Sequence, residues 1–206
     1  MSNSLRPSYQ TDQSVNTFPW SMIWFNALRR PYVATFEEFI RDPKASSQRA
    51  LLWVFISTLL GGFIIGLNPY GRFGALPLRT TLIGISLLSI ISVAWFVLLT
   101  GFAQLTARVL GGTGTYVHLA YAIAAFHAPL TILRGLFLTS PIIGFMFFGY
   151  GIWLTAIAIK AVQKISWGKT VLATTSVFIC IFIVVGLAVL MIYQILGSNV
   201  IYPPLI

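Results

Sequence analysis

The sequence predicts an all-α integral membrane protein: a five-transmembrane-helix bundle preceded by N-terminal amphipathic helices at the membrane interface. Three observations support this prediction. The 206 residues are 57% hydrophobic and only 8% charged, whereas a soluble domain carries roughly 25% charged residues. Five apolar segments are long enough to cross a bilayer. The acidic residues all precede residue 43, and Lys and Arg flank the apolar segments.

The placement of the charges excludes several classes of function. Proton relays and cation pathways in membranes are usually built on carboxylates, and no Asp or Glu follows Asp42. The single cysteine, Cys180, excludes an intramolecular disulfide and a thiolate metal cluster. The net charge of +9 lies in loops between apolar segments, where it contacts anionic lipid headgroups rather than nucleic acid. We therefore expect packing and binding rather than enzymatic activity, with no resident metal.

The N-terminal part divides into a polar tail, residues 1–17, and an interfacial segment, residues 18–49. The tail is rich in Ser, Asn, Gln and Thr, so we expect it to be disordered unless a partner holds it. The interfacial segment begins with an apolar stripe at helical spacing that predicts one short helix. Arg29, Arg30 and Pro31 end this helix. The stripe consists of Trp20, Ile23, Trp24, Ala27 and Leu28.

A second short helix is predicted to begin at Thr35. Thr35 and Glu38 have the spacing of a capping box, and Pro43 ends the helix. Both short helices carry too many charges to span a membrane. We expect them to lie in the plane of the interface, with Trp20 and Trp24 at headgroup level. The alternative is that they pack on a soluble partner.

Five spans are predicted within residues 50–197, since a hydrocarbon core of roughly 30 Å needs about 20 helical residues. The third and fourth are separated by so few residues that they form a tight hairpin. Residues 198–206 contain Pro203–Pro204 and form an extramembrane tail. The predicted spans are Ala50–Leu67, Leu82–Leu105, Tyr116–Leu138, Pro141–Val162 and Thr170–Gly197.

The basic residues predict the orientation of the bundle. With five spans, ten Lys and Arg residues fall on the side of the N-terminus, and only Arg72, Arg79 and Arg134 fall on the other side. The positive-inside rule then places the N-terminus in the cytoplasm and the C-terminus outside. The ten residues are Arg6, Arg29, Arg30, Arg41, Lys44, Arg49, Arg108, Lys160, Lys164 and Lys169.

A glycine-rich segment, residues 111–115, joins the second and third spans. Beside Arg108, such a loop could hold a phosphate with its amides. It lacks the lysine of a P-loop, and no strand precedes it, so neither nucleotide-binding pattern is met. A tight turn between helices, in which Gly111, Gly112 and Gly114 serve packing, is the favoured interpretation.

His118 and His127 are the candidates for contact with a cofactor. Nine residues place them on opposite faces of the third span, so they cannot share a metal ion. Each could contact a pigment carried by another subunit, but an imidazole that only packs is the favoured interpretation. Pro129 frees the carbonyl of Ala125, which a nearby polar group can satisfy. We expect no cofactor, and a bound lipid or a pigment contact is left open.

Small and aromatic residues predict where helices approach one another and where the membrane boundary lies. Gly62 and Gly66 allow close helix contact in the first span, and a similar role is assigned to a group in the fourth. Packing inside the bundle is the favoured interpretation, and a dimer face is the alternative. Arg134 is expected to snorkel to headgroups. The group in the fourth span is Gly149, Gly151 and Trp153. The residues expected at the interface are Trp20, Trp24, Arg29, Arg30 and Trp53.

The order of these features resembles the Yip-domain family, named for interaction with Ypt/Rab GTPases. Three blocks carry the resemblance, which covers roughly residues 20–195. Trp24–Pro43 joins a Trp-containing segment, Arg-Arg-Pro and an aromatic short helix, and Leu110–Pro129 joins a Gly-Gly turn to an aromatic and alanine helix. The third block is a Trp-containing fourth span that leads into a basic loop, Gly151–Lys160 and Ser166–Lys169.

The resemblance implies five spans and a cytosolic N-terminus. It also implies a bacterial-type member in the plasma membrane, because the Asp-Leu-Tyr-Gly-Pro block of the eukaryotic members is absent. We interpret the chain as a non-catalytic scaffold or accessory subunit of a larger membrane complex. Its expected partners are the other integral membrane subunits of that complex. Respiratory and photosynthetic complexes are the candidates for it. The alternatives are a trafficking adaptor that recruits a small GTPase, and a small transporter or channel.

Overall fold

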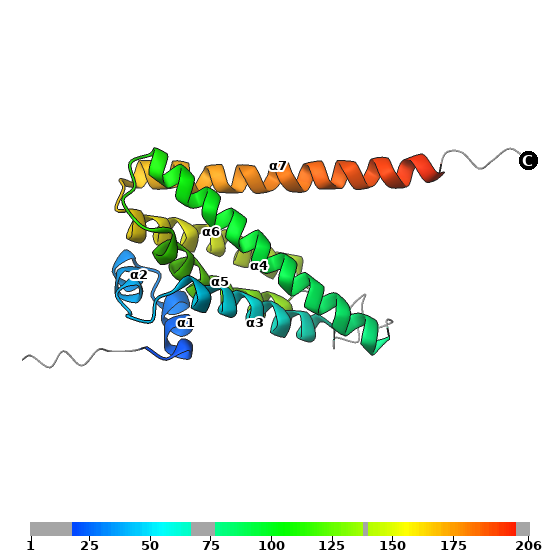
Figure 1. Cartoon of the computed structure of the whole chain (residues 1–206), viewed down its shortest axis with the longest axis horizontal. Helices are drawn as coiled ribbons and strands as arrows, with labels where there is room; N and C mark the ends of the chain where they lie inside the picture. The colour runs from blue at the N-terminus through cyan, green and yellow to red at the C-terminus, as the bar shows by residue number, and fades with distance from the viewer. Residues whose placement is uncertain (1–17, 67–76, 138–139, 201–206) are drawn as a thin grey trace, which may run out of the picture.

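A computed structural model describes residues 18–66, 77–137 and 140–200, and these residues form helices joined by turns (Figure 1). The predicted polar tail, residues 1–17, and the end of the chain after residue 200 lie outside the described residues. The helices are α1 (Trp20–Arg29), α2 (Val33–Ile40), α3 (Ser47–Gly66), α4 (Leu78–Val109), α5 (Tyr116–Leu136), α6 (Pro141–Gln163) and α7 (Trp167–Val200).

Five of these helices, α3 to α7, are long and apolar enough to cross a membrane. The predicted five-span membrane bundle is confirmed. The helices extend beyond the apolar runs: α3 begins at Ser47 rather than Ala50, and α4 and α7 are longer than predicted at both ends. α7 includes the first residues of the predicted tail 198–206. An apolar run marks only the part within hydrocarbon, whereas helical hydrogen bonding continues into polar residues outside it.

The two short helices differ from their prediction in one respect. α1 ends at Arg29 as expected, but α2 begins at Val33 rather than Thr35. Tyr32 is extended and caps α2 through its backbone, and the Thr35 amide donates to the Tyr32 carbonyl at 3.1 Å. Thr35 therefore lies inside the first turn, and the predicted capping box with Glu38 is wrong. Pro31 gives the physical reason, because it holds the chain extended just before this helix.

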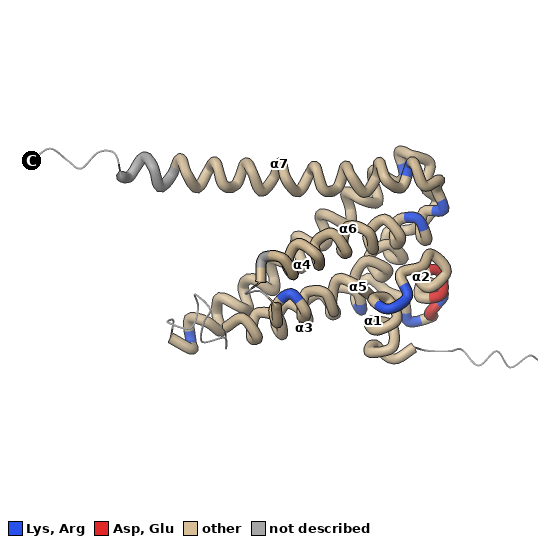
Figure 2. Tube along the Cα trace, turned by 180° about the vertical axis from the view of Figure 1, so that it is seen from behind, with Lys and Arg blue, Asp and Glu red and all other residues tan. Residues whose placement is uncertain are grey.

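One end of the bundle carries α1, α2, the α4–α5 turn and the α6–α7 turn (Figure 1). We call residues 18–46, which comprise α1, α2 and the turn into α3, the platform, and this end the platform end. Figure 2 shows Lys and Arg gathered here, together with the acidic residues of α2. Arg79 lies at the opposite end, where α4 begins.

The centre of the bundle is α5, which packs against α1, α2, α3, α4 and α6. Its closest neighbour is α3, at a crossing between two glycines. A Cβ at Gly135 would lie 3.0 Å from the Gly61 carbonyl oxygen, so the two backbones nearly touch. Gly62 and Gly66 face α4 instead, and a Cβ at Gly62 would lie 2.8 Å from Ile85. Small residues thus allow close contacts that dispersion stabilises within the membrane.

The last helix, α7, packs against the bundle only over its first part. α7 contacts α4 and α6 near the platform end, where Ala173 and Val177 are buried. Farther along, α4 and α7 diverge (Figure 1). From Ile183 to Tyr193 every side chain of α7 is exposed, and most of them are apolar. The outer half of α7 is therefore the least supported part of the described chain.

Candidate functional site

A buried ion pair fixes the platform to the spans. Asp42 follows α2, and its Oδ2 lies 2.9 Å from the Arg49 Nη1 on α3. The Tyr121 hydroxyl of α5 donates to the same oxygen at 3.1 Å. The Lys44 amide donates to the Asp42 Oδ1 at 2.9 Å. One carboxylate thus connects the platform with two transmembrane helices.

Aromatic rings enclose the cation of this pair. The Arg49 guanidinium lies 5.0 Å from the ring centroid of Trp53 and 5.7 Å from that of Tyr121. The ring centroid of Trp20 on α1 lies 6.0 Å from the same guanidinium. The Arg49 Nη2 donates to the Phe18 carbonyl at 3.1 Å. Cation–π contacts of this kind strengthen as the cation loses water. The arrangement locks α1 and α3 together around one guanidinium.

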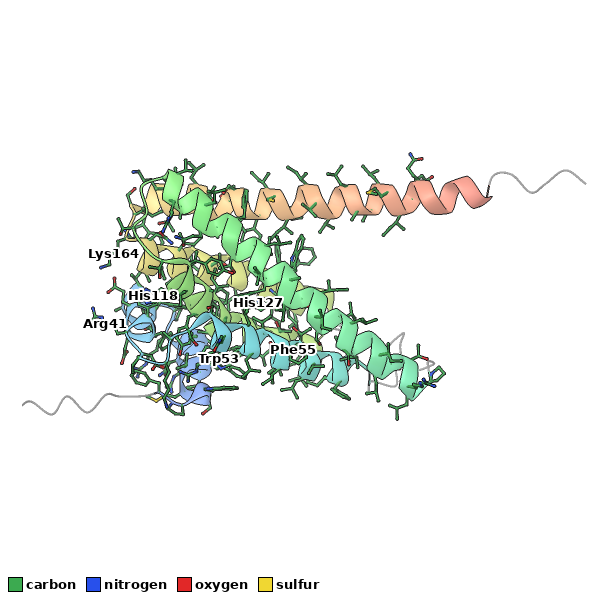
Figure 3. All side chains as sticks on the ribbon, viewed as in Figure 1. Arg41, Trp53, Phe55, His118, His127 and Lys164 are labelled. Carbon is green, nitrogen blue, oxygen red and sulfur yellow. The ribbon has the colours of Figure 1, made fainter. Side chains whose placement is uncertain are left out.

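The environment of Trp53 corrects its predicted role at the membrane boundary. Its side chain is fully buried, beside α1 at the platform end (Figure 3). Its ring contacts Trp20 and Trp24 at centroid distances of 5.9 Å and 6.0 Å. Trp53 cannot face headgroups, because the platform covers the position where the start of a span would otherwise meet them.

The apolar stripe of α1 also faces the chain itself. Ile23 and Ala27 are buried, and the Tyr150 hydroxyl of α6 donates to the Leu28 carbonyl. On the opposite side of α1, Phe25 is 59% exposed. The Arg29 guanidinium lies 5.5 Å from the Phe25 ring centroid. α1 therefore packs on the spans with one side and presents a second apolar side outward.

The remaining residues predicted for the membrane interface differ in their exposure. Trp20 is partly exposed, although one side of its ring covers Arg49. Trp24 is half-buried against Trp53, whereas Arg29 and Arg30 are exposed. These two arginines are therefore the members of the predicted set that are free to meet headgroups.

The glycine-rich segment is a turn held by two glutamines. Gln104 of α4 donates to the Gly114 carbonyl at 2.8 Å, and the Gly114 amide donates to the Gln163 Oε1 at 3.1 Å. Gln163, at the end of α6, donates to Gln104 at 2.5 Å. Thr115 caps α5 by accepting from the His118 amide. The turn thereby joins α4, α5 and α6 at the platform end.

Steric constraints explain why glycine occupies three positions of this turn. Gly111 has a φ of 93°, which L-residues with a side chain rarely adopt. A Cβ at Gly112 would lie 2.6 Å from the Gln163 Oε1 and 2.8 Å from the Ala107 carbonyl oxygen. A Cβ at Gly114 would overlap the Val162 carbonyl. The amides of Gly112 and Gly114 are already occupied within the chain, which favours packing over phosphate binding.

A cavity of about 480 Å³ lies between α3, α4, α5, α6 and α7. Apolar side chains form most of its wall, among them Phe96 and Leu99 of α4, Phe148 of α6, and Phe178 of α7. Hydroxyl groups also line it from α3, α4 and α6, on Thr58, Ser92, Thr100 and Thr155. The polar lining residues of α5 are His127, Thr131 and Arg134. Their spacing of four and seven residues places them on one face of that helix.

The two histidines occupy different surroundings, as their spacing predicts. His118 lies near the platform end and His127 near the middle of the bundle (Figure 3). The His127 ring lies 5.8 Å from that of Phe96. α5 continues through Pro129, and the Thr131 hydroxyl donates to the His127 carbonyl at 2.9 Å. Among the described residues, no three His, Cys, Asp or Glu side chains are placed to hold a metal ion.

Arg134 does not reach outward as we expected. It is half-buried and lines the cavity. Its Nη2 donates to the Phe147 carbonyl of α6 at 3.3 Å, and a Cβ at Gly151 would lie 3.2 Å from the same nitrogen. Gly151 thus makes room for the guanidinium, which is drawn inward because α6 offers an acceptor there.

The other two residues of the predicted packing group on α6 face away from the core. Open space surrounds Gly149, so no helix of the described chain packs against it. Trp153 is 51% exposed and stacks on Trp167 of α7 with ring centroids 6.1 Å apart. The prediction that Gly149 packs inside the bundle is therefore wrong. Trp153 contacts Trp167 at the surface of the bundle.

Several residues of these sites were not singled out by sequence reasoning. Asp42, Arg49 and Tyr121 form the ion-pair site, and Gln104 with Gln163 form the turn site. Sequence offers one usable signal, because polar side chains near the ends of apolar spans need partners. It does not say which partners they take.

Comparison with known proteins agrees with the architecture. The chain matches the family model of the Yip1 domain over residues 25–190, a range that contains α2 to α6, half of α1 and most of α7. No curated protein and no solved structure matches the chain.

Proposed function

The chain belongs to the Yip1 domain family, and from this premise we propose that it is a non-catalytic scaffold, an accessory subunit that joins other integral membrane proteins into a larger complex. The observation that carries the proposal is the outer half of α7. Its described side chains from Ile183 to Tyr193 contact little of the rest of the chain. A stretch of a span that has no neighbouring helix among the described residues has a free surface for a helix of another subunit.

The length of α7 supports the same proposal. Its 34 residues extend over about 51 Å, at roughly 1.5 Å a residue, whereas the hydrocarbon core measures roughly 30 Å. The helix begins at the platform end, so its far end reaches beyond the core. A helix of this length offers a partner contact within the membrane and past it.

The platform contributes a second, rigid surface. The ion pair of Asp42 and Arg49 holds it against the spans, so its outward residues keep a fixed position. We propose that the outward side of α1, with Phe25, Arg29 and Arg30, rests in the headgroup layer. The platform end then faces the cytoplasm of a bacterial cell, and the C-terminus lies outside, in agreement with the distribution of Lys and Arg.

The orientation is tested with reporters fused to each terminus. We expect a reporter that is active only in the cytoplasm to work at the N-terminus and to fail at the C-terminus. A second reporter, active only outside, should give the reverse result. Activity of the same reporter at both ends would contradict five spans with this orientation.

The scaffold role is tested by photo-cross-linking in native membranes. A photoreactive residue replaces Leu187, Val189 or Leu190 in separate variants, which together sample the faces of outer α7. We expect at least one position to give a discrete protein adduct of constant mass. Leu98 on α4 is the matched control because it has similar exposure, and it should give lipid adducts. Only lipid adducts at all three α7 positions would contradict the proposal.

Absence of catalysis is the other part of the proposal. His118 and His127 are the side chains best suited to acid–base chemistry. Among the described residues, neither side chain has a hydrogen bond or ion pair with a carboxylate that could orient it. We expect His118→Gln and His127→Gln to change the yield of assembled complex, not its turnover per complex. A His127→Gln complex that assembles normally and has lost turnover would contradict this part.

A further inference from the structure

The cavity between α3, α4, α5, α6 and α7 places a cation beside an apolar space. Arg134 lines it from the last turn of α5. The guanidinium carries five N–H donors, and the one hydrogen bond found for it within the described chain goes to the Phe147 carbonyl. Donors therefore remain for a further group. A carbonyl also carries no full charge, so the positive charge of Arg134 is not neutralised by this contact.

No acidic side chain of the bundle can neutralise Arg134. The last carboxylate along the chain is Asp42, and it is occupied by Arg49 at the platform end. A cation inside a membrane is costly unless it is paired. The described residues supply no negative charge to Arg134, so a ligand that pairs with it would carry an anionic group.

The apolar lining of the cavity indicates that the ligand also has an apolar part. Phe96 and Leu99 of α4 and Phe178 and Ile181 of α7 contribute apolar side chains to its wall. These side chains offer no charge and suit hydrocarbon. The volume of about 480 Å³ falls within the roughly 300–1,000 Å³ of small-molecule sites. A small hydrophilic anion would leave most of this apolar wall uncovered.

The cavity reaches the side of the bundle that faces lipid. Ile91 of α4 lines it and is 61% exposed. On α7 the lining ends at Ile181, and the described side chains that follow it on this helix are exposed. Away from the platform end, α4 and α7 diverge (Figure 1). A hydrocarbon chain can therefore pass from the cavity into the bilayer without crossing a polar barrier.

From these observations we propose that the cavity binds an anionic lipid. The acid group of the headgroup pairs with the Arg134 guanidinium, and one hydrocarbon chain lies along the wall between α4 and α7. His127 lies about 10 Å deeper along α5, at roughly 1.5 Å a residue, and its ring is available to a polar group at the base of the headgroup. This site is independent of any partner subunit.

The test uses the purified full-length chain in a mild detergent, with binding followed by native mass spectrometry and by the thermal unfolding midpoint. The probes are phosphatidylglycerol, phosphatidylcholine and inorganic phosphate. We expect phosphatidylglycerol to bind and to raise the midpoint, and the other two to have little effect. Equal effects of phosphatidylcholine would overturn the role of charge, and equal effects of inorganic phosphate would overturn the role of the hydrocarbon chain.

Arg134→Gln is the decisive variant and Arg79→Gln is its matched control. Both remove one positive charge near the same end of the bundle, but Arg79 is exposed and lies outside the cavity lining. We expect Arg134→Gln to weaken phosphatidylglycerol binding at least about tenfold, as expected for loss of a charge-assisted hydrogen bond. Arg79→Gln should bind as the wild type does, and equal binding by both variants would overturn the site.

A second variant keeps the test decisive if Arg134→Gln does not fold. Ser92 lines the cavity, and Ser92→Phe fills part of the space without changing any charge. We expect this variant to lose affinity for phosphatidylglycerol while its unfolding midpoint without lipid stays near that of the wild type. Unchanged affinity in Ser92→Phe would place the lipid elsewhere on the protein and overturn the proposal.

Discussion

Replacing Asp42 by Asn should release the platform from the spans. The change removes the charge that lies 2.9 Å from the Arg49 guanidinium and leaves that cation uncompensated among aromatic rings. The Arg49 side chain is 10% exposed and the Asp42 side chain is 0% exposed, so the ion pair is buried. Breaking a buried pair from one side destabilises a protein by roughly 3–5 kcal/mol. Asn keeps an acceptor for the Tyr121 hydroxyl, which favours the lower limit, about 3 kcal/mol.

Hydrogen exchange of the purified chain is the appropriate assay, because the effect should be local. A loss of about 3 kcal/mol corresponds to a rise of roughly 100-fold in the opening equilibrium, at about 1.4 kcal/mol for each factor of ten. We expect this acceleration at the amides of α1 and α2, and a much smaller one in the buried middle of α5. Loss of protection that is uniform over all helices would instead indicate global unfolding.

Glu38→Gln is the matched control, since it neutralises an exposed carboxylate on the neighbouring helix α2. Surface changes of this kind stay within about 0.5 kcal/mol. Combining Asp42→Asn with Arg49→Gln should destabilise the platform less than the sum of the two single changes, because the second removes the unpaired cation. Equal exchange in Asp42→Asn and Glu38→Gln would refute the reasoning.

Three further changes test the contacts between helices, each measured as the free energy of unfolding. Gly112→Ala should destabilise the protein by about 1–3 kcal/mol through overpacking against Gln163, whereas Gly144→Ala, in open space, should not. Gln163→Ala should lower stability by roughly 1–3 kcal/mol, because it leaves the Gly114 amide without its acceptor. Gly135→Ala should separate α5 from α3 and destabilise by about 1–3 kcal/mol. A variant equal in stability to Gly144→Ala would contradict the contact assigned to it.

The sequence predicts the five spans well because a membrane imposes a length and a composition on each of them. It also predicts the end of α1, where Arg29 and Arg30 precede a proline. Helix limits are less accurate, as α4 and α7 show, since polar residues beyond the hydrocarbon can continue a helix. The start of α2 was wrong because backbone capping by Tyr32 took the place of a side-chain cap.

The sites were harder to predict, because they depend on pairs far apart in sequence. Tyr121 and Asp42 are 79 residues apart, and Gln163 and Gln104 are 59 apart. Trp53 has the position of an interfacial anchor in the sequence, and only the packing of α1 shows that it is covered. Arg134 also lies near a helix end, but the nearby α6 carbonyl and the space beside Gly151 turn it inward.

The central claim, that this chain is a subunit that joins other membrane proteins, is tested most directly by the native mass of the complex that contains it. The measurement is native mass spectrometry after gentle extraction of the tagged chain from its own membranes. We expect a species well above the 22.7 kDa of the chain, with at least one other integral membrane protein at constant stoichiometry. Deletion of the chain should reduce the amount of that partner in its assembled form. Recovery of the chain alone or as copies of itself, with assembly of membrane complexes unchanged in the deletion strain, would contradict the claim.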